Sequence, residues 1–303
     1  MTSQIFFNAL ISASIYALIA LGFVVIYSTV RFFHLAHGAV YTMGAYGAYT
    51  AVKLLSNSGS TGMQAVPLWI YAVATIAAMG IASATGILID LLVYKPLRRT
   101  KATSLILLLA SFGVFIFLEN LIALIYGNQI LSLRTGPVKE GYHLFGAVIT
   151  PIQILIILSA LIMFLFLFAL TRLTKIGKAM RAVADDPVTA SVVGINPEKV
   201  IFFAFALGSA LAGLAGMLVS LETNLEPTMG FGALLKGMIA AIVGGIGSLT
   251  GALLGSIFLG FTENIAVWFL PAGWKDAIAF SVFLIFLLFR PEGILGKKEE
   301  EAG

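Results

Sequence analysis

The sequence predicts an all-α, polytopic integral membrane protein, and three observations support this prediction. Of the 303 residues, 60% are hydrophobic and only 11% are charged, whereas a soluble domain carries about 25% charged residues. The mean hydropathy is +1.03. Uncharged apolar stretches of about 20 residues, long enough to cross a hydrocarbon core of ~30 Å, recur along the chain. A transmembrane β-barrel is excluded because its strands would alternate apolar and polar residues.

The apolar stretches predict about eight or nine spanning helices in a single membrane domain of residues 1–303. The segments 32–39 and 232–250 each have features of a broken or re-entrant helix, so the exact count there stays open. The N-terminus lacks a basic region and a cleavage site, so it is interpreted as part of the first span. In order, the predicted spans are 5–28, 40–55, 68–93, 104–126, 149–170, 201–221, 231–247, 249–270 and 276–289.

Small residues spaced by four predict the faces on which helices pack closely. The first span carries such a row, and the spans 201–221 and 249–270 carry longer ones. These rows are Ala9, Ala13 and Ala17; Ala204, Gly208, Ala212, Gly216 and Ser220; Gly247, Gly251 and Gly255; and Ser248, Ala252, Ser256 and Gly260.

The connections between the spans differ in charge, and this difference predicts their orientation. The 56–67 loop is rich in Gly and Ser, and 94–101 is a compact basic loop. Basic loops stay on the cytoplasmic side. Thirteen of the 18 Lys and Arg fall on one side if the N-terminus is outside and the C-terminus inside: one at Arg31, four in 94–101, five in 171–200, and three at Arg290, Lys297 and Lys298.

The longest polar segment, 171–200, is predicted to be one or two short helices at the cytoplasmic face. Asp185 or Asp186 precedes Pro187, a pattern typical of a capped helix start. Gly194, followed by Asn196 and a proline, is a helix stop. The segment is therefore either an ordinary folded loop or a docking surface for a cytoplasmic partner.

Ionisable residues inside predicted spans are candidates for a transport path, because burying them in a membrane is costly. Glu119 and Glu263 each precede an asparagine in similar tetrapeptides, FLEN and FTEN, a hint of an internal repeat. The structural alternative is that both carboxylates reach the interface or hydrogen-bond to the neighbouring Asn. Lys236 is likewise either a path residue or a lysine that extends to the membrane surface.

Other chemistries find little support. His34 and His37 would need further ligands for a metal site, and none lies close in sequence. They fit a role at a helix break better. The chain has no cysteine and no GxxxxGK[ST] loop for ATP. We expect no catalytic residue, metal, cofactor or nucleic-acid partner, since the positive charge is that of cytoplasmic loops. The GGIGS stretch around Gly245 is interpreted as helix packing or a helix break.

Four segments carry a resemblance to a known family. They are YALIALGFVVIYSTVRFFHLAHGAVYTMGAY (16–46), GKAMRAVADDPVTASVVGIN (177–196), IVGGIGSLTGALLGS (242–256) and RPEGILG (290–296). In this order they look like the LivH-type permease subunits of bacterial branched-chain amino-acid ABC importers. The resemblance covers both ends and the centre of the chain, and it is less specific for substrate.

The resemblance implies a multi-pass subunit in the bacterial inner membrane that works by alternating access. It implies as partners two cytoplasmic ABC ATPase subunits, a second permease (itself or a related chain), an external substrate-binding protein, membrane lipid and an amino-acid substrate. The ATPase-coupling residues would be Arg181, Ala182, Asp185, Asp186, Ala190, Gly194 and Ile195. This loop lacks the Glu-Ala-Ala of wider importer patterns. We expect the translocation path to involve His37, Gly38, Glu119, Lys236, Gly245 and Glu263.

Three alternatives stay open. Within the family, the substrate would be urea or a short amide. An ion-coupled secondary transporter acting alone would need a buried carboxylate pair at mid-membrane, and the candidates here lie nearer the outer side. A non-transporting structural subunit is the third alternative, and the two candidate helix breaks argue against it.

Overall fold

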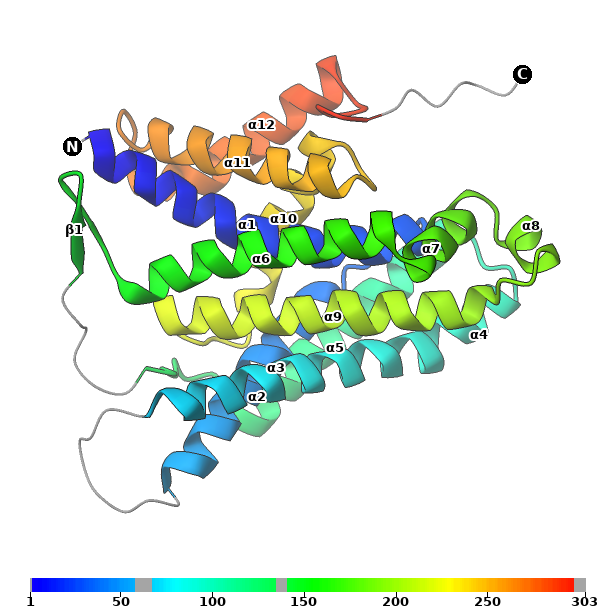
Figure 1. Ribbon diagram of the computed structural model, residues 1–303. Helices are drawn as coiled ribbons and strands as arrows, with labels where there is room; N and C mark the ends of the chain where they lie inside the picture. Colours follow the sequence, from blue (N-terminus) through cyan, green and yellow to red (C-terminus); the bar gives the residue numbers. More distant parts are fainter. Residues whose placement is uncertain (1, 58–66, 135–140, 297–303) are drawn as a thin grey trace.

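A computed structural model describes residues 2–57, 67–134 and 141–296, and Figure 1 shows them as a bundle of long helices. The predicted all-α, polytopic class is confirmed. Most of the 56–67 loop, together with Lys297 and Lys298, lies outside the described residues. The main helices are α1 (Thr2–Val30), α2 (His37–Asn57), α3 (Leu68–Ile89), α5 (Ser104–Tyr126), α6 (Pro151–Leu173), α9 (Pro197–Glu222), α10 (Met229–Gly244), α11 (Leu249–Ala266) and α12 (Lys275–Phe289).

Seven helical segments of the described chain are long and apolar enough to cross a membrane. They are α1, α3 with its extension to Arg99, α5, α6, α9, α11 and the segment 272–289. The apolar helix α10 is shorter, and α2 is rich in Tyr and Gly. A count of eight or nine spans therefore depends on α2 and α10 and stays a prediction. Helices α1 and α9 are mostly buried, whereas α5, α6 and α12 bury only a minority of their residues.

Helix α9 packs against α1, α2 and α3 through the small residues that the sequence singled out. A Cβ on Gly208 would lie 2.7 Å from the Gly22 carbonyl of α1, and one on Gly216 would meet the Tyr41 carbonyl of α2. Ala204, Ala212 and Ser220 are buried. These backbones approach so closely that no side chain fits between them, which is the packing mode of small residues in membranes.

The predicted break at 32–39 is present, because α1 ends at Val30 and α2 begins at His37. Arg31 has a positive φ of 54°, which turns the chain out of the helix. Phe32 and Ala36 are buried among neighbouring helices. Non-helical backbone at membrane depth is tolerated when protein covers it in this way.

The basic segment 94–101 is mostly a helical extension and not the predicted loop. Helix α3 continues through one π-helical turn, η1 (Asp90–Tyr94), into α4 (Lys95–Arg99). Pro96 in an α-helix would crowd the carbonyl four residues earlier, at Leu92. The wide η1 turn contains Leu92 and ends in a bond from the Lys95 N–H to the Asp90 carbonyl, so the chain accommodates the proline without ending the helix.

A short antiparallel hairpin, β1 (Tyr142–Leu144) and β2 (Ala147–Ile149), precedes α6. Phe145 and Gly146 both have positive φ, as a two-residue turn between twisted strands requires. Gln4 of α1 holds the hairpin: the Val148 N–H donates to the Gln4 Oε1 at 2.8 Å. The hairpin and the N-terminus thus share one end of the bundle (Figure 1).

Candidate functional site

The polar segment between α6 and α9 folds as two short helices, α7 (Lys175–Asp185) and α8 (Pro187–Val192). This confirms the predicted helices. Thr174 caps α7 by accepting from the Gly177 N–H at 3.1 Å, and Asp186 caps α8 by accepting from the Val188 N–H at 2.8 Å. Side-chain caps satisfy amide groups that a helix start leaves unpaired. The segment therefore has a defined shape.

Helix α7 is fixed to the bundle by a buried face. Gly177, Met180 and Val183 are buried, and a Cβ on Gly177 would collide with the Leu170 and Thr171 carbonyls of α6. The Arg31 Nε donates to the Ala184 carbonyl at 3.3 Å, which connects α7 to the break between α1 and α2. A displacement of α7 would therefore act on that break.

The seven predicted coupling residues divide into two groups. Ala190 is buried and Ala182 and Ile195 are partly buried, while Gly194 has a φ of 86° at the helix stop. These four shape the segment. The exposed group is Arg181, Asp185 and Asp186. Of these, Arg181 donates to the Thr171 carbonyl and Asp186 is the α8 cap.

An exposed apolar surface, formed by α8 and the residue that follows it, was not predicted from the sequence. Val188, Val192 and Val193 are 72%, 82% and 69% exposed. Ala190 faces the protein, so these valines face away from it. An apolar patch on a polar, structured segment indicates a surface that binds another molecule. The spacing of Val188 and Val192, one helical turn apart, was the signal available in the sequence. The valine surface below means these three residues.

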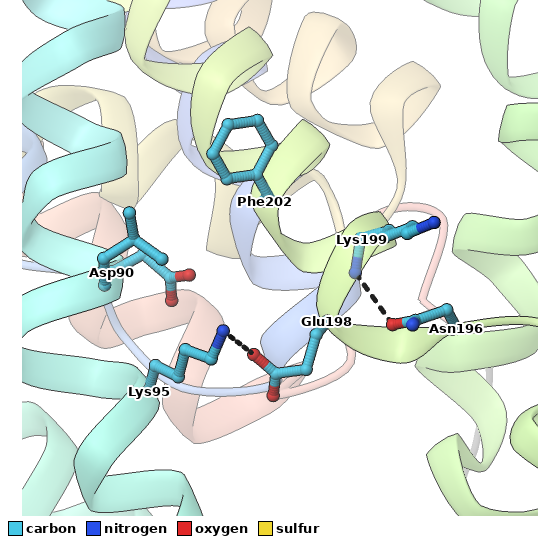
Figure 2. A pocket seen from close by; sticks show the side chains of 7 residues that line it. Asp90, Lys95, Asn196, Glu198, Lys199 and Phe202 are labelled. Atoms are coloured by element: carbon cyan, nitrogen blue, oxygen red, sulfur yellow. Dashed lines mark hydrogen bonds and ion pairs between the residues drawn. The ribbon is translucent and has the colours of Figure 1, made fainter.

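An ion network joins α4 to the start of α9, next to α7 and α8. Arg98 bonds to Asp90 at 2.6 Å, and the Glu198 carboxylate lies 3.6 Å from both Arg98 and Lys95. Figure 2 shows the Lys95 and Glu198 side chains pointing toward each other, while the Lys199 side chain points away from this pair. All three residues line a cavity of about 320 Å³. The network fixes α9 to the α3–α4 rod at this end of the bundle.

His34 and His37 are both buried at the start of α2. His34 Nδ1 lies 2.8 Å from the Tyr94 hydroxyl, which donates to Ser111 at 2.8 Å. Ser111 also accepts from the Ala36 N–H. No group of three or more His, Asp or Glu that could hold a metal ion occurs in the part of the chain that the structure describes. This network therefore cross-links the helix break to η1 and α5.

Lys236 and Glu263 come together in a transmembrane cluster with two residues that the sequence analysis did not select. The Tyr16 hydroxyl donates to Glu263 Oε2 at 2.5 Å, and Lys236 Nζ lies 3.5 Å from Glu263 Oε1 and 2.9 Å from Asp276. The side chains come from α1, α11, α10 and α12. Glu263 is fully buried, and its partners are Tyr16 and Lys236 rather than Asn264, which bonds to Ser12 and Gly260.

The other predicted path residues lie apart from this cluster. Glu119 is partly buried on α5. Gly38 on α2 is in close contact with α10, because a Cβ there would lie 2.6 Å from the Gly230 carbonyl. Gly245 has a φ of 112° in the turn between α10 and α11, which pack as an antiparallel pair. His37 lies at the helix break.

The GGIGS turn is covered by the segment that follows α12. The Ile294 N–H donates to the Val243 carbonyl at 2.8 Å, and the Leu295 N–H donates to the Gly244 carbonyl at 2.9 Å. GGIGS is thus the connection between α10 and α11, at which the helix breaks. The backbone contact needs glycine, since a Cβ on Gly245 would lie 2.6 Å from the Gly296 nitrogen.

Comparison with known proteins gives a consistent result. Residues 5–287 match the family model for the branched-chain amino acid transport system permease component. The high-affinity branched-chain amino acid transport system permease protein LivH of Escherichia coli (strain K12) is 36% identical, over 98% of this chain and 96% of its own. The permease protein BraD of Pseudomonas aeruginosa, from a system of the same description, is 36% identical, over 97% and 95%.

Among solved structures, the fold resembles a chain of PsaBC from Streptococcus pneumoniae in complex with Fab. The TM-score is 0.51 at 14% identity, over 94% of this chain and 91% of the other. This likeness concerns the fold alone. The relatives described above are transport permeases that match this chain from end to end.

Proposed function

The chain belongs to the family of branched-chain amino acid transport system permease components, and from this premise we propose that it is the membrane subunit of an ATP-driven importer for branched-chain or related amino acids. It is a multi-pass protein of the inner membrane. In the proposal, two cytoplasmic ATPase subunits supply the energy, an external binding protein delivers the substrate, and a second permease, identical or related, completes the path. Membership of this family favours that assembly over a carrier acting alone.

The proposed topology has nine crossings, with the N-terminus outside and the C-terminus inside. It counts the seven long apolar segments together with α2 and α10. The arrangement in Figure 1 supports it, because α4, α7 and α8 gather at the opposite end of the bundle from the N-terminus and β1. The basic residues of these elements would all lie in the cytoplasm.

The ATPase subunits would dock on α7 and α8, and the observation that carries this proposal is the valine surface. Its three side chains are exposed on a helix that is capped and fixed to the bundle. A rigid apolar surface can bind a partner and also transmit force. The Arg31–Ala184 bond and the Glu198 ion network would pass that force to the α1–α2 break and to the α3–α4 rod.

The transport step would be alternating access driven by this motion. The predicted path roles of His37, Gly38, Glu119 and Gly245 remain proposals within this scheme. The substrate alternative, urea or a short amide, would be decided by the uptake profile of the complete importer.

The first experiment is a pull-down of the tagged chain from mild detergent, with its partners identified by mass. We expect two ATPases with nucleotide-binding motifs and a permease to co-purify. The Val192→Asp variant should lose the ATPases because it places a charge in an apolar contact, while the permease fold remains. The matched control is Val148→Asp, at an exposed valine in β2 at the opposite end. Full recovery of the ATPases with Val192→Asp would rule out the valine surface as the docking site.

A further inference from the structure

A cavity of about 250 Å³ lies between the apolar helices α10 and α12. Its walls are mainly apolar, from Phe231, Leu235, Ile239 and Phe280, and two charged residues, Lys236 and Asp276, line it as well. Pockets for drug-sized ligands measure about 300–1,000 Å³ and combine apolar walls with a few polar groups. This cavity therefore has the composition of a ligand site and the size for a smaller molecule.

The two charged residues of the cavity form a direct ion pair. Lys236 Nζ lies 2.9 Å from Asp276 Oδ1, and the Asp276 side chain is 76% exposed. On its other side, Lys236 lies 3.5 Å from Glu263, whose side chain is fully buried. One carboxylate is thus free to leave the lysine, and the other is held in the protein by the Tyr16 hydroxyl. Ionisable residues at membrane depth are functional candidates by default.

We infer that this cavity binds the zwitterion of an α-amino acid with an aliphatic side chain. The ligand carboxylate accepts hydrogen bonds from Lys236 Nζ, its ammonium donates to Asp276, and its side chain lies against Phe231 and Phe280. The inference rests on the proposed function and names the substrate site for it. Binding replaces the Lys236–Asp276 ion pair with two ion pairs to the ligand, so neither charged residue is left without a partner. A neutral ligand that separated Lys236 from Asp276 would leave both charges unpaired.

Glu263 and Tyr16 position the lysine in this site. Glu263 Oε1 lies 3.5 Å from Lys236 Nζ, and this contact keeps Nζ near the cavity while Asp276 turns to the ligand. The Tyr16 hydroxyl lies 3.4 Å from the same Nζ. These residues keep a cation in place when the Lys236–Asp276 contact opens.

The location suits a transport path. Tyr16 is the middle residue of the 29-residue α1, and α12 begins at the end of the bundle where α1 starts, as the Asn264–Ser12 bond near the end of α11 indicates. In the proposed orientation that end is external. The cavity thus lies between the middle of the membrane and the side from which substrate is delivered.

The test is direct binding to the purified importer in nanodiscs, without nucleotide and without the external binding protein. Saturation-transfer NMR reports contact between leucine methyl protons and the protein. We expect binding of leucine, and roughly tenfold weaker binding of leucinamide, which lacks the carboxylate, and of 4-methylpentanoate, which lacks the ammonium. Equal binding of all three ligands would overturn the inference.

Variants of Lys236 and Asp276 test which ligand group each residue binds, and a variant of Glu226 is the control. Lys236→Gln should weaken leucine binding roughly tenfold and abolish its preference over leucinamide, and Lys236→Arg should restore both. Asp276→Asn should instead abolish the preference over 4-methylpentanoate. Asp276 is exposed, so this variant retains the fold. Glu226→Gln removes an exposed carboxylate of the 223–228 connection outside the cavity and should bind like the wild type.

A purely structural role for the cluster would lower binding of all three ligands alike and would leave the preferences unchanged, which overturns the inference. The outcome is separable from the proposed function. If the ATPases co-purify but the variants bind leucine like the wild type, the proposed importer function stands and this substrate site is ruled out. If the two variants each lose their own preference but the chain recruits no ATPase, the site stands and the importer function is ruled out.

Discussion

At the scale of the residue, the Asp186 side chain stabilises the start of α8 as its N-cap. It accepts from the Val188 N–H at 2.8 Å and from the Thr189 hydroxyl. These bonds, the Thr189 hydroxyl first, lower the pKa of Asp186 below its ordinary value. A carboxylate with a lowered pKa in the folded state stabilises that state above the pKa of the unfolded chain, and the stabilisation is lost as the pH falls through the folded pKa.

We therefore predict that amide hydrogen exchange in 188–192, corrected for intrinsic rates, speeds up when the pH falls below the range in which aspartate ionises. Asp186→Ala should show fast exchange at neutral pH, because the cap acceptor is gone. Asp186→Asn should keep most of the protection at neutral pH and lose the pH dependence. An unchanged pH dependence in Asp186→Asn would show that another group titrates.

At the scale of the element, small residues decide which helices can pack closely against each other. A Cβ on Gly213 of α9 would lie 2.4 Å from the Ala78 carbonyl and 2.6 Å from the Ala82 Cβ, both on α3. Backbone atoms cannot move aside as a flexible side chain can. The α3–α9 contact thus depends on this position being glycine.

Gly213→Val should lower the stability of the bundle by about 1–3 kcal/mol, the usual cost of overpacking. The measurement is the thermal unfolding midpoint in detergent. The control is Gly113→Ala on α5, where an added Cβ meets nothing within 4 Å, and where replacing glycine in a helix is neutral or slightly stabilising. A wild-type midpoint for Gly213→Val would contradict the close contact.

The orientation belongs to the scale of the whole molecule. The hairpin that begins with β1 and the helix α8 lie at opposite ends of the bundle (Figure 1), so a single experiment can place both. The chain contains no cysteine, so a single introduced thiol reports only its own position.

We predict that a membrane-impermeant maleimide labels the Phe145→Cys variant in intact spheroplasts. The Ser191→Cys variant, in α8, should react only after permeabilisation. Both side chains are exposed in the structure, so access and not burial decides the result. The opposite labelling pattern would reverse the proposed topology, and it would place the valine surface outside the cell.

Much of the local structure of 171–200 could be predicted from sequence, whereas most of the cluster around Lys236 could not. The cap at Asp186 and the stop at Gly194 depend on neighbours within a few residues, so local patterns reveal them. Lys236 and Tyr16 are 220 residues apart, and Asp276 looked like an ordinary helix start. Only the packing of α1, α10, α11 and α12 brings these side chains together.

By itself the sequence determined the membrane class, most of the long apolar helices and the close-packing faces, because each depends on composition or on local spacing, and its resemblance to known permeases indicated the family. The tertiary structure decided which helices use those faces, that GGIGS is a turn covered by 293–296, and that α8 exposes its valines. All small-residue faces have similar local sequence patterns, and so do all apolar spans. The pattern of one helix therefore does not reveal which other helix packs against it. That choice is made by the summed packing of the whole bundle.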